Sequence, residues 1–284
     1  MTSGAWLDAA VLRQLLDGTP WAPPEVHDSI DSTNAEALRR PEVWRVVAAG
    51  HQRAGRGRLD RSWESAAGRS AAISVVVPAP AARPQDWAWL PLLTGLAMCE
   101  AVGSVTGVAA ALKWPNDVLA RRRPDAYGDP EAPDAHAAPG DAWGKVAGVL
   151  VEMAGAAPVA VAGAGLNLSH RRDELPVPTA TSLALCGAAS FGVERLLAAY
   201  LRRLADLVAG WLAGGPALEA GRAAYRARCA TIGTQVTVHL PDGPAAPGAA
   251  VAVDDDGRLV LRRPGGTTRY AAGDIQHARG PAKP

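Results

Sequence analysis

Two apolar runs organise this chain, Val146-Ala-Gly-Val-Leu-Val-Glu-Met153 and Val159-Ala-Val-Ala-Gly-Ala-Gly-Leu-Asn-Leu168. A Gly-Ala-Ala-Pro turn signal, residues 155–158, joins them. Glycines inside an apolar strand, here Gly163 and Gly165, mark places where a ligand or another backbone approaches closely. They lack the third glycine of a dinucleotide-binding fingerprint. The pattern therefore predicts a buried β-hairpin whose second strand makes a close approach of this kind.

Length and composition indicate a soluble globular protein. The 284 residues suit one large domain and one smaller domain, and 48% hydrophobic residues are enough for a sizeable core. A formal net charge of +1 provides no global field that attracts nucleic acid or an anionic membrane. The three cysteines have no disulfide or metal-ligand spacing, and the first residues lack a basic n-region and an apolar h-region. We therefore expect a cytoplasmic protein with no membrane partner.

Hydrophobic periodicity predicts the remaining elements. Helices are expected at residues 5–17, 33–40, 87–105, 193–212 and 216–229, and further strands at 25–30, 45–49, 71–77 and 110–114. Thr33 and Glu36 form a capping-box pattern. Residues 121–141 are interpreted as a flexible insertion. Beyond Thr231, short strands at 234–239, 249–253, 258–262 and 268–271 predict a small barrel, so we divide the chain into 1–24 (helix and joint), 25–229 and 230–284.

A loop rich in arginine and glycine, His51–Trp63, lies between two predicted strands. Its glycines allow the backbone to approach a ligand, and Arg56 and Arg58 supply forked donors suited to phosphate or carboxylate. The Trp63 ring is suited to stacking on an aromatic base. The loop predicts an anion site, and a solvated basic loop or an RNA-binding patch are the alternatives.

Three other clusters hold lysines and asparagines, which are rare in a chain with three lysines against 26 arginines. Lys113-Trp-Pro-Asn-Asp117 follows a predicted strand, where open sheets bind ligands, although Pro-Asn-Asp is also ordinary turn chemistry. The glycines around Lys145 lack phosphate-loop spacing. Lys145 is therefore either an ammonium group that faces a pocket or a surface lysine. The side-chain amide of Asn167 is suited to hydrogen bonding with the edge of an adenine base. Ser32-Thr-Asn34 offers three hydrogen-bonding side chains or a helix cap.

Taken in order, these clusters closely resemble the motifs of the biotin protein ligase family. The motifs are Asp31-Ser-Thr-Asn34, Gln52-Arg-Ala-Gly-Arg-Gly-Arg58, Lys113-Trp-Pro-Asn-Asp117, Lys145-Val-Ala-Gly-Val-Leu-Val-Glu152 and Gly163-Ala-Gly-Leu-Asn167. The resemblance implies an α+β fold. It implies a mixed-sheet catalytic domain like that of biotin and lipoate ligases, followed by a small C-terminal SH3-like β-barrel.

The resemblance also implies a two-step reaction. Biotin and MgATP give biotinyl-5′-AMP, and a lysine of a biotin carboxyl carrier domain of acetyl-CoA carboxylase, or of a related carboxylase, then receives the biotinyl group. The implied catalytic residues are Lys145 and Arg58. The implied biotin-binding residues are Ser32, Thr33, Asn34, Gln52, Arg56, Gly57, Arg58, Lys145 and Gly148. The implied ATP-binding residues are Arg56, Arg58, Trp63, Lys113, Asn116 and Asn167, with Asp117 as the Mg²⁺ ligand.

The chain departs from the family pattern in three places. Asp60 stands in the arginine loop where some members have glycine, and the 121–141 insertion is longer than the family needs. Residues 1–24 are too few for the winged helix-turn-helix of members that repress transcription, so the resemblance implies a ligase that does not bind DNA. The rival interpretations are a lipoate ligase, which shares fold and adenylate chemistry, and a non-catalytic RNA-binding module that uses the arginine loop.

Overall fold

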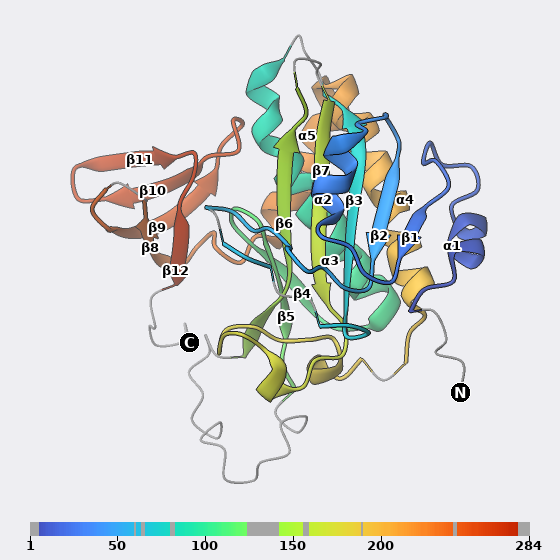
Figure 1. Ribbon diagram of the computed structural model, residues 1–284. Coiled ribbons are helices and arrows are strands. Elements are labelled where there is room, and N and C mark those ends of the chain that lie inside the picture. Colours follow the sequence, from blue (N-terminus) through green and yellow to red (C-terminus); the bar gives the residue numbers. More distant parts are fainter. Residues whose placement is uncertain are drawn as a thin grey trace.

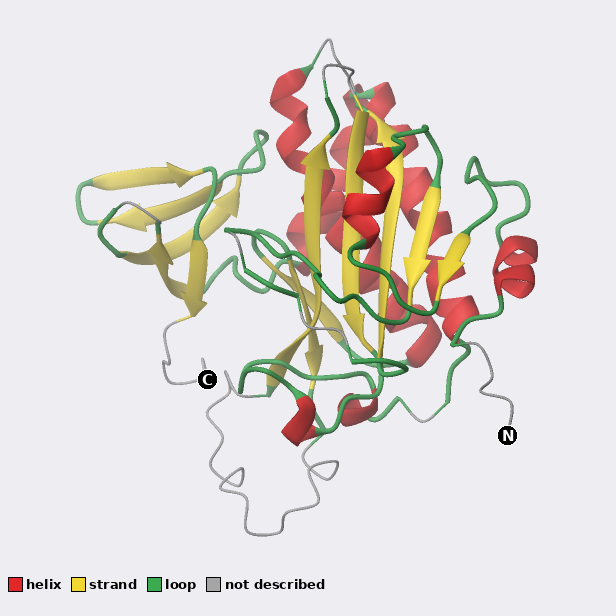
Figure 2. Cartoon of the chain, in the orientation of Figure 1, coloured by secondary structure: helices red, strands yellow, loops and turns green. Residues whose placement is uncertain are grey.

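The computed structural model describes residues 6–59, 61–63, 66–79, 83–123, 142–155, 159–188, 190–240 and 243–277. Within these residues the chain forms two sheets, a mixed sheet of seven strands and an antiparallel sheet of five. The helices pack on the larger sheet, and the smaller sheet forms a separate domain beside it (Figure 1, Figure 2).

The strands of the large sheet are β1 (Glu25–His27), β2 (Val46–Ala49), β3 (Ser70–Pro78), β4 (Ala110–Lys113), β5 (Asp117–Arg121), β6 (Trp143–Met153) and β7 (Val159–Asn167). Their order across the sheet is β1-β2-β3-β7-β6-β5-β4. β1 and β2 pair in parallel, and the other neighbours pair antiparallel. The predicted hairpin is confirmed as β6 and β7, which occupy the interior of the sheet.

Helices cover the two faces of this sheet unequally. The α-helices of the described residues are α1 (Ala9–Leu15), α2 (Thr33–Arg39), α3 (Trp89–Thr106), α4 (Val193–Ala213) and α5 (Gly215–Arg228). Short 3-10 segments occur at Pro84–Ala88, Arg172–Glu174 and Ala184–Cys186. α2 lies alone on one face, whereas α3, α4 and α5 lie on the other (Figure 1).

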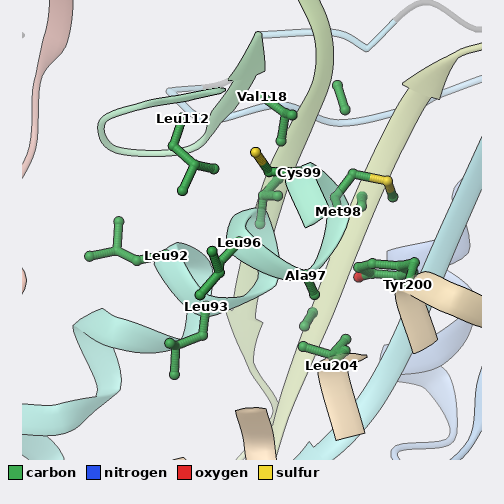
Figure 3. Close-up of a cluster of buried hydrophobic side chains, with 14 of the residues drawn as sticks. Leu92, Leu93, Leu96, Ala97, Met98, Cys99, Leu112, Val118, Tyr200 and Leu204 are labelled. Carbon is green, nitrogen blue, oxygen red and sulfur yellow. The ribbon is translucent and has the colours of Figure 1, made fainter. Parts of the chain in front are cut away.

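The largest part of the core lies on the face covered by α3. This helix is apolar on all sides because it is packed between the sheet and α4. Figure 3 shows Leu96 and Met98 of α3 near Leu112 of β4 and Tyr200 of α4, all of them buried. By length and composition, Pro84–Thr106 is the one described segment able to cross a membrane, and 67% of its apolar window is buried inside the protein, as in a core helix.

The small domain follows α5. Its strands are β8 (Gln235–His239), β9 (Ala246–Val253), β10 (Leu259–Arg263), β11 (Gly266–Tyr270) and β12 (Asp274–His277), in the order β11-β10-β9-β8-β12. It is the small C-terminal SH3-like domain that the sequence predicts. Two indoles of the large domain donate to its backbone: Trp89 Nε1 to Asp255 O at 2.6 Å and Trp114 Nε1 to Gly257 O at 3.0 Å.

Three sequence-based expectations need correction. Ser32, not Thr33, is the N-cap of α2, because the Ser32 hydroxyl accepts from the backbone of Ala35 while Thr33 is turned into the interior. The insertion does not begin at Arg121, which pairs with β6 as the last residue of β5. Residues 124–141 lie outside the described part of the chain.

The strand β12 was not predicted, since its four residues include a single buried apolar side chain. The domain boundaries at residues 24 and 229 stay a prediction.

Candidate active site

A cavity of about 1240 Å³ opens on the α2 side of the large sheet. Its wall is formed by the start of α2, residues 51–58 and 61–63 of the arginine loop, the turn between β4 and β5, the hairpin β6–β7, residues from the segment 170–180 that follows β7, and β12 of the small domain. Every residue that the sequence analysis assigned to catalysis, biotin, ATP or metal lines this cavity. The structure therefore brings the five motifs together, and the individual roles stay predictions.

One end of the cavity is a neutral hydrogen-bonding network. Gln52 Oε1 accepts from the backbone N–H of Thr33 at 2.8 Å and from its hydroxyl at 3.1 Å. The buried hydroxyl of Ser74 on β3 lies 2.7 Å from Thr33 Oγ1 and 2.6 Å from Asn34 Oδ1. These bonds fix the rotamers of side chains that otherwise rotate freely, so this end is organised without a ligand.

Asn34 is held from three sides. Its Nδ2 donates to Glu152 Oε2 at 2.8 Å and to the Leu150 carbonyl at 3.2 Å. Its Oδ1 lies so close to Gly163 that a Cβ at that position would overlap it. Position 163 of β7 therefore requires glycine, because Asn34 occupies the space of a Cβ atom. The close approach predicted at this strand is made by the Asn34 side chain.

The arginine loop crosses the cavity next to this network. Arg56 Nη2 pairs with Glu152 Oε2 at 2.9 Å, and Arg58 Nη1 donates to Asn116 Oδ1 at 3.3 Å. Asn116 is in turn fixed by its bond from Nδ2 to the Val149 carbonyl at 2.9 Å. Desolvation by burial lowers the pKa of the Arg58 guanidinium, and the nearby carboxylate of Asp117 partly opposes that shift. Arg58 is a half-buried cation whose environment favours the arrival of an anion.

Trp63 closes the loop over two glycines of the hairpin. A Cβ on Gly165 would overlap the indole, and a Cβ on Gly148 would lie 3.0 Å from its Cζ3 atom. The Trp63 Nε1 atom is buried and has no hydrogen-bond partner within the described residues. A buried donor without a partner carries a desolvation cost that a ligand acceptor would relieve.

The other end of the cavity gathers cations around one carboxylate. Lys145 Nζ lies 2.6 Å from Asp117 Oδ1 and 5.5 Å from the centroid of the Trp63 ring. Lys113 Nζ lies 4.0 Å from Asp117 Oδ2. Burial lowers the pKa of Lys113, while Asp117 acts in the opposite direction and Lys145 adds to the lowering. Two ammonium groups thus share one carboxylate, which leaves the cluster with excess positive charge.

A β-bulge places Lys145 on the cavity side. β5 and β6 pair Val118 with Ala147 and Leu119 with Lys145, so Val146 is an extra residue in β6. Strand alternation would otherwise give Lys145 the same face as Ala147, which lies in the core with α3. The extra residue reverses that alternation and turns the ammonium into the cavity.

The role of Asp117 as a Mg²⁺ ligand stays a prediction. No group of three or more His, Cys, Asp or Glu side chains able to hold a metal ion occurs within the described ranges. The Asp117 carboxylate is engaged by Lys145, and Mg²⁺ prefers carboxylates combined with phosphate oxygens and water. A single carboxylate does not hold Mg²⁺ by itself, so Mg²⁺ is expected to enter as part of MgATP, with Asp117 as its predicted carboxylate ligand.

Sequence reasoning missed residues that support the site from behind. Ser74 fixes Thr33 and Asn34, and its only signal is a polar residue in the middle of an apolar strand. Glu152 was quoted as the end of a motif but received no role. Asp274 on β12 lines the cavity and forms an ion pair with Arg61 of the arginine loop, a contact that no local pattern indicates.

Comparisons with known proteins agree with this geometry. The Biotin/lipoate A/B protein ligase family matches residues 26–167, and the Biotin protein ligase C terminal domain matches residues 231–278. The biotin--[acetyl-CoA-carboxylase] ligase of Mycobacterium tuberculosis is 38% identical over 96% of this chain and 96% of its own length. The ligase of the same name from Paracoccus denitrificans is 34% identical over 86% of this chain and 96% of its own.

A solved structure shares the fold. The biotin protein ligase from Aquifex aeolicus in complex with biotin and ATP superposes with a TM-score of 0.71, covers 90% of this chain and 99% of its own, and is 22% identical. Sequence and fold agree over both domains: the chain belongs to the biotin protein ligase family.

Proposed function

We propose that this chain attaches biotin to a lysine of a biotin carboxyl carrier domain, at the expense of ATP, through a biotinyl-5′-AMP intermediate. The observation that carries the proposal is the polarity of the cavity. A neutral network for a ring occupies one end, and Lys113, Lys145 and Arg58 surround the other. Biotin has matching polarity, with a cyclic urea at one end and a carboxylate at the other.

The hydrogen-bonding inventory of the neutral end suits a cyclic urea. Both N–H groups of Asn34 are used by Leu150 and Glu152, so its oxygen remains an acceptor for a ligand N–H. The oxygen of Gln52 is used by Thr33, so its amide nitrogen remains a donor. Ser32 Oγ accepts from Ala35 and keeps its hydroxyl hydrogen to donate. These donors and acceptors complement the carbonyl and N–H groups of a ureido ring, which lipoate lacks.

The cationic end of the cavity would reduce the repulsion between the biotin carboxylate and the phosphates of ATP. In the first step a biotin carboxylate oxygen bonds to the α-phosphorus of ATP, the bond from that phosphorus to the bridging oxygen breaks, and pyrophosphate leaves. Lys145 and Arg58 would offset the negative charge of carboxylate and phosphate as they meet. The Mg²⁺ that accompanies ATP supplies further neutralisation of the phosphates.

Adenine would lie against Trp63 and Asn167. Asn167 Nδ2 donates to the Thr181 carbonyl at 3.0 Å, so its oxygen is left to accept from an exocyclic amine. The indole of Trp63 supplies a stacking surface and an unpaired donor.

In the second step the neutral amine of the carrier lysine attacks the acyl carbon of biotinyl-5′-AMP. AMP leaves, and the amine loses a proton to give an amide.

The proposed partner is a biotin carboxyl carrier domain of acetyl-CoA carboxylase or of a related carboxylase. The names of the Mycobacterium tuberculosis and Paracoccus denitrificans relatives support the first of these. The proposal places the protein in the cytoplasm, because Cys99, Cys186 and Cys229 are free and buried, as suits a reducing compartment. It includes neither DNA nor a membrane as a partner.

A carrier-labelling experiment tests the proposal. The purified protein is incubated with MgATP, a biotin carboxyl carrier domain and either biotin or lipoate, and carrier mass and pyrophosphate are measured. We expect a biotin-sized mass gain on one carrier lysine and no gain with lipoate. A lipoate-sized gain would replace the proposal with a lipoate ligase. Absence of both mass gain and pyrophosphate, together with salt-sensitive RNA binding, would favour the RNA-binding interpretation.

A further inference from the structure

Glu152 on β6 joins two parts of the cavity that belong to separate motifs. Its Oε2 atom accepts from Asn34 Nδ2 at 2.8 Å and from Arg56 Nη2 at 2.9 Å. Asn34 belongs to the start of α2, and Arg56 belongs to the arginine loop. A single carboxylate oxygen therefore holds the neutral end of the cavity and the loop that crosses it.

The position of Glu152 makes this link costly to break. β6 is an interior strand, and Glu152 lies opposite Val161 of β7 with 24% of its side chain exposed. A partly buried carboxylate is expensive without a donor or a cation, and charge-assisted hydrogen bonds are the stronger kind. Without Arg56, Glu152 would lose its cation and retain only the neutral amide of Asn34.

Glu152 also determines which atom Asn34 presents to a ligand. The Asn34 amide nitrogen faces two acceptors, the Glu152 carboxylate and the Leu150 carbonyl. Rotating the amide by half a turn would bring three oxygens together and leave the nitrogen facing the Ser74 hydroxyl. The carboxylate thus favours the orientation in which Asn34 Oδ1 is the acceptor beside Gly163.

We propose that Glu152 is a positioning residue that links the orientation of Asn34 at the biotin end to the position of Arg56 in the arginine loop. The inference rests on the proposed function. Asn34 and Arg56 line the cavity whereas Glu152 does not, so it acts through them. A ligand N–H bound to Asn34 Oδ1 polarises the amide and strengthens its donation to Glu152 Oε2. Because coupling is reciprocal, the ion pair between Arg56 and Glu152 raises biotin affinity by the factor by which bound biotin strengthens that ion pair.

The first experiment replaces the carboxylate with its neutral isostere. For Glu152→Gln we expect biotin affinity, measured calorimetrically without ATP, to fall about 10-fold, and release of biotinyl-5′-AMP to solvent to become faster by about the same factor. The rate of the adenylation step at saturating biotin should change little, because Glu152 does not touch the reacting atoms. Wild-type biotin affinity in this variant would overturn the inference.

The matched control is Glu100→Gln on α3. Glu100 is a carboxylate of similar exposure, 20%, that also pairs with two arginines, Arg203 and Arg228. Because it lies outside the cavity wall, Glu100→Gln should keep biotin affinity and adenylate release at wild-type values. An equal loss in both variants would assign the effect to general loss of ion pairs and would overturn a specific role for Glu152.

A double-mutant cycle separates coupling from local damage. Arg56 is 45% exposed, so Arg56→Gln leaves the core intact and should itself speed adenylate release. If Glu152 acts through Arg56, adding Glu152→Gln to Arg56→Gln should increase release by less than about 2-fold, far less than in the wild-type background. Fully multiplicative effects would contradict the coupling.

The same measurements distinguish failure of this inference from failure of the proposed function. Wild-type protein that labels the carrier with biotin upholds the function whatever Glu152→Gln does. Wild-type protein that neither binds biotin nor releases pyrophosphate rejects both.

Discussion

The two faces of the large sheet are built from the same strands and serve different purposes. On β3, Ile73 and Val75 point toward α3 and α4, whereas Ser74 between them points toward the start of α2. On β7, alternate residues Gly163 and Gly165 form the floor of the cavity, while Ala162 and Ala164, which alternate with them, join the apolar core. Because successive side chains of a strand point to opposite faces, one continuous apolar sequence supplies both the core that stabilises the fold and the floor of the cavity.

Several costly polar groups gather around the cavity on the α2 face, although the opposite face also buries the unpaired hydroxyl of Tyr200. The buried Trp63 Nε1 without a partner, the desolvated Arg58 and the crowded cations near Asp117 all lie around the cavity. Such groups lower stability, and the tightly packed opposite face offsets their cost. Substitutions on the two faces should therefore affect different measurements.

The largest expected effect is at Lys145. Lys145→Ala removes the ammonium that the bulge turns into the cavity, and we expect adenylate formation to fall by roughly 10³-fold, measured as biotin-dependent pyrophosphate exchange. The melting temperature should change little, because the loss of the ion pair with Asp117 is opposed by relief of the crowding of Lys145 with Lys113. Near-normal exchange would remove Lys145 from the mechanism.

A smaller but still large effect is expected at the cavity floor. In Gly163→Ala the new Cβ would overlap Asn34 Oδ1, so the asparagine must leave its position between Glu152 and Ser74. We expect biotin affinity to fall about 100-fold, as for loss of several hydrogen bonds to a ligand. Gly103→Ala is the control, because its Cβ would meet only Val108 O at 3.8 Å. Unchanged biotin affinity in Gly163→Ala would contradict the proposed place of the ureido ring.

The opposite face should give the reverse result. Leu96 of α3 is fully buried in the core, so Leu96→Ala is expected to lower the free energy of unfolding by about 2–5 kcal/mol. Biotin affinity, measured below the melting temperature, should remain within about 2-fold of wild type because the cavity face is unaltered. Urea unfolding and calorimetry test the two parts. A proportionate loss of affinity would show that the two faces are not independent.

The sequence predicts the elements and the list of site residues because their signals are local. The glycines at 163 and 165, the Pro-Asn-Asp turn and the arginine loop each identify themselves within a few residues. The hairpin β6–β7 is likewise a local event, since its turn is short and its strands are adjacent. The resemblance to the biotin protein ligase family rests on these same short stretches.

What the sequence does not predict is set by contacts between distant segments. Ser74 and Asn34 are 40 residues apart, and Asn34 and Glu152 are 118 apart. The extra residue Val146 becomes apparent only when β6 is aligned with its partner strand β5. The strand β5 was not predicted, because it follows a proline turn that is also typical of a loop. Such pairings depend on the packed sheet, so no local pattern contains them.

The smallest expected effect concerns polar groups on the α2 side that lie away from the cavity. Arg45 is buried and pairs with Glu25 at 2.7 Å and with Glu36 at 2.9 Å. Hydrogen bonds from Arg45 hold the pKa values of both carboxyls below their ordinary value of 4.5, so the folded protein binds these protons less readily than the unfolded chain. Their contribution to stability is therefore complete above pH 4.5 and is lost as the pH falls through the lowered values.

Comparison of wild type with Arg45→Met isolates that contribution. With solvent exposure taken into account, each carboxylate is expected to contribute about 1 kcal/mol or less. The difference in unfolding free energy between wild type and variant, from urea titrations, should be constant from neutral pH to about 4.5 and should shrink below it. Biotin affinity at neutral pH should not change, because none of the three side chains lines the cavity. A difference independent of pH would mean that Arg45 stabilises the fold by packing alone, and a change in biotin affinity would extend the site beyond the cavity along the α2 face.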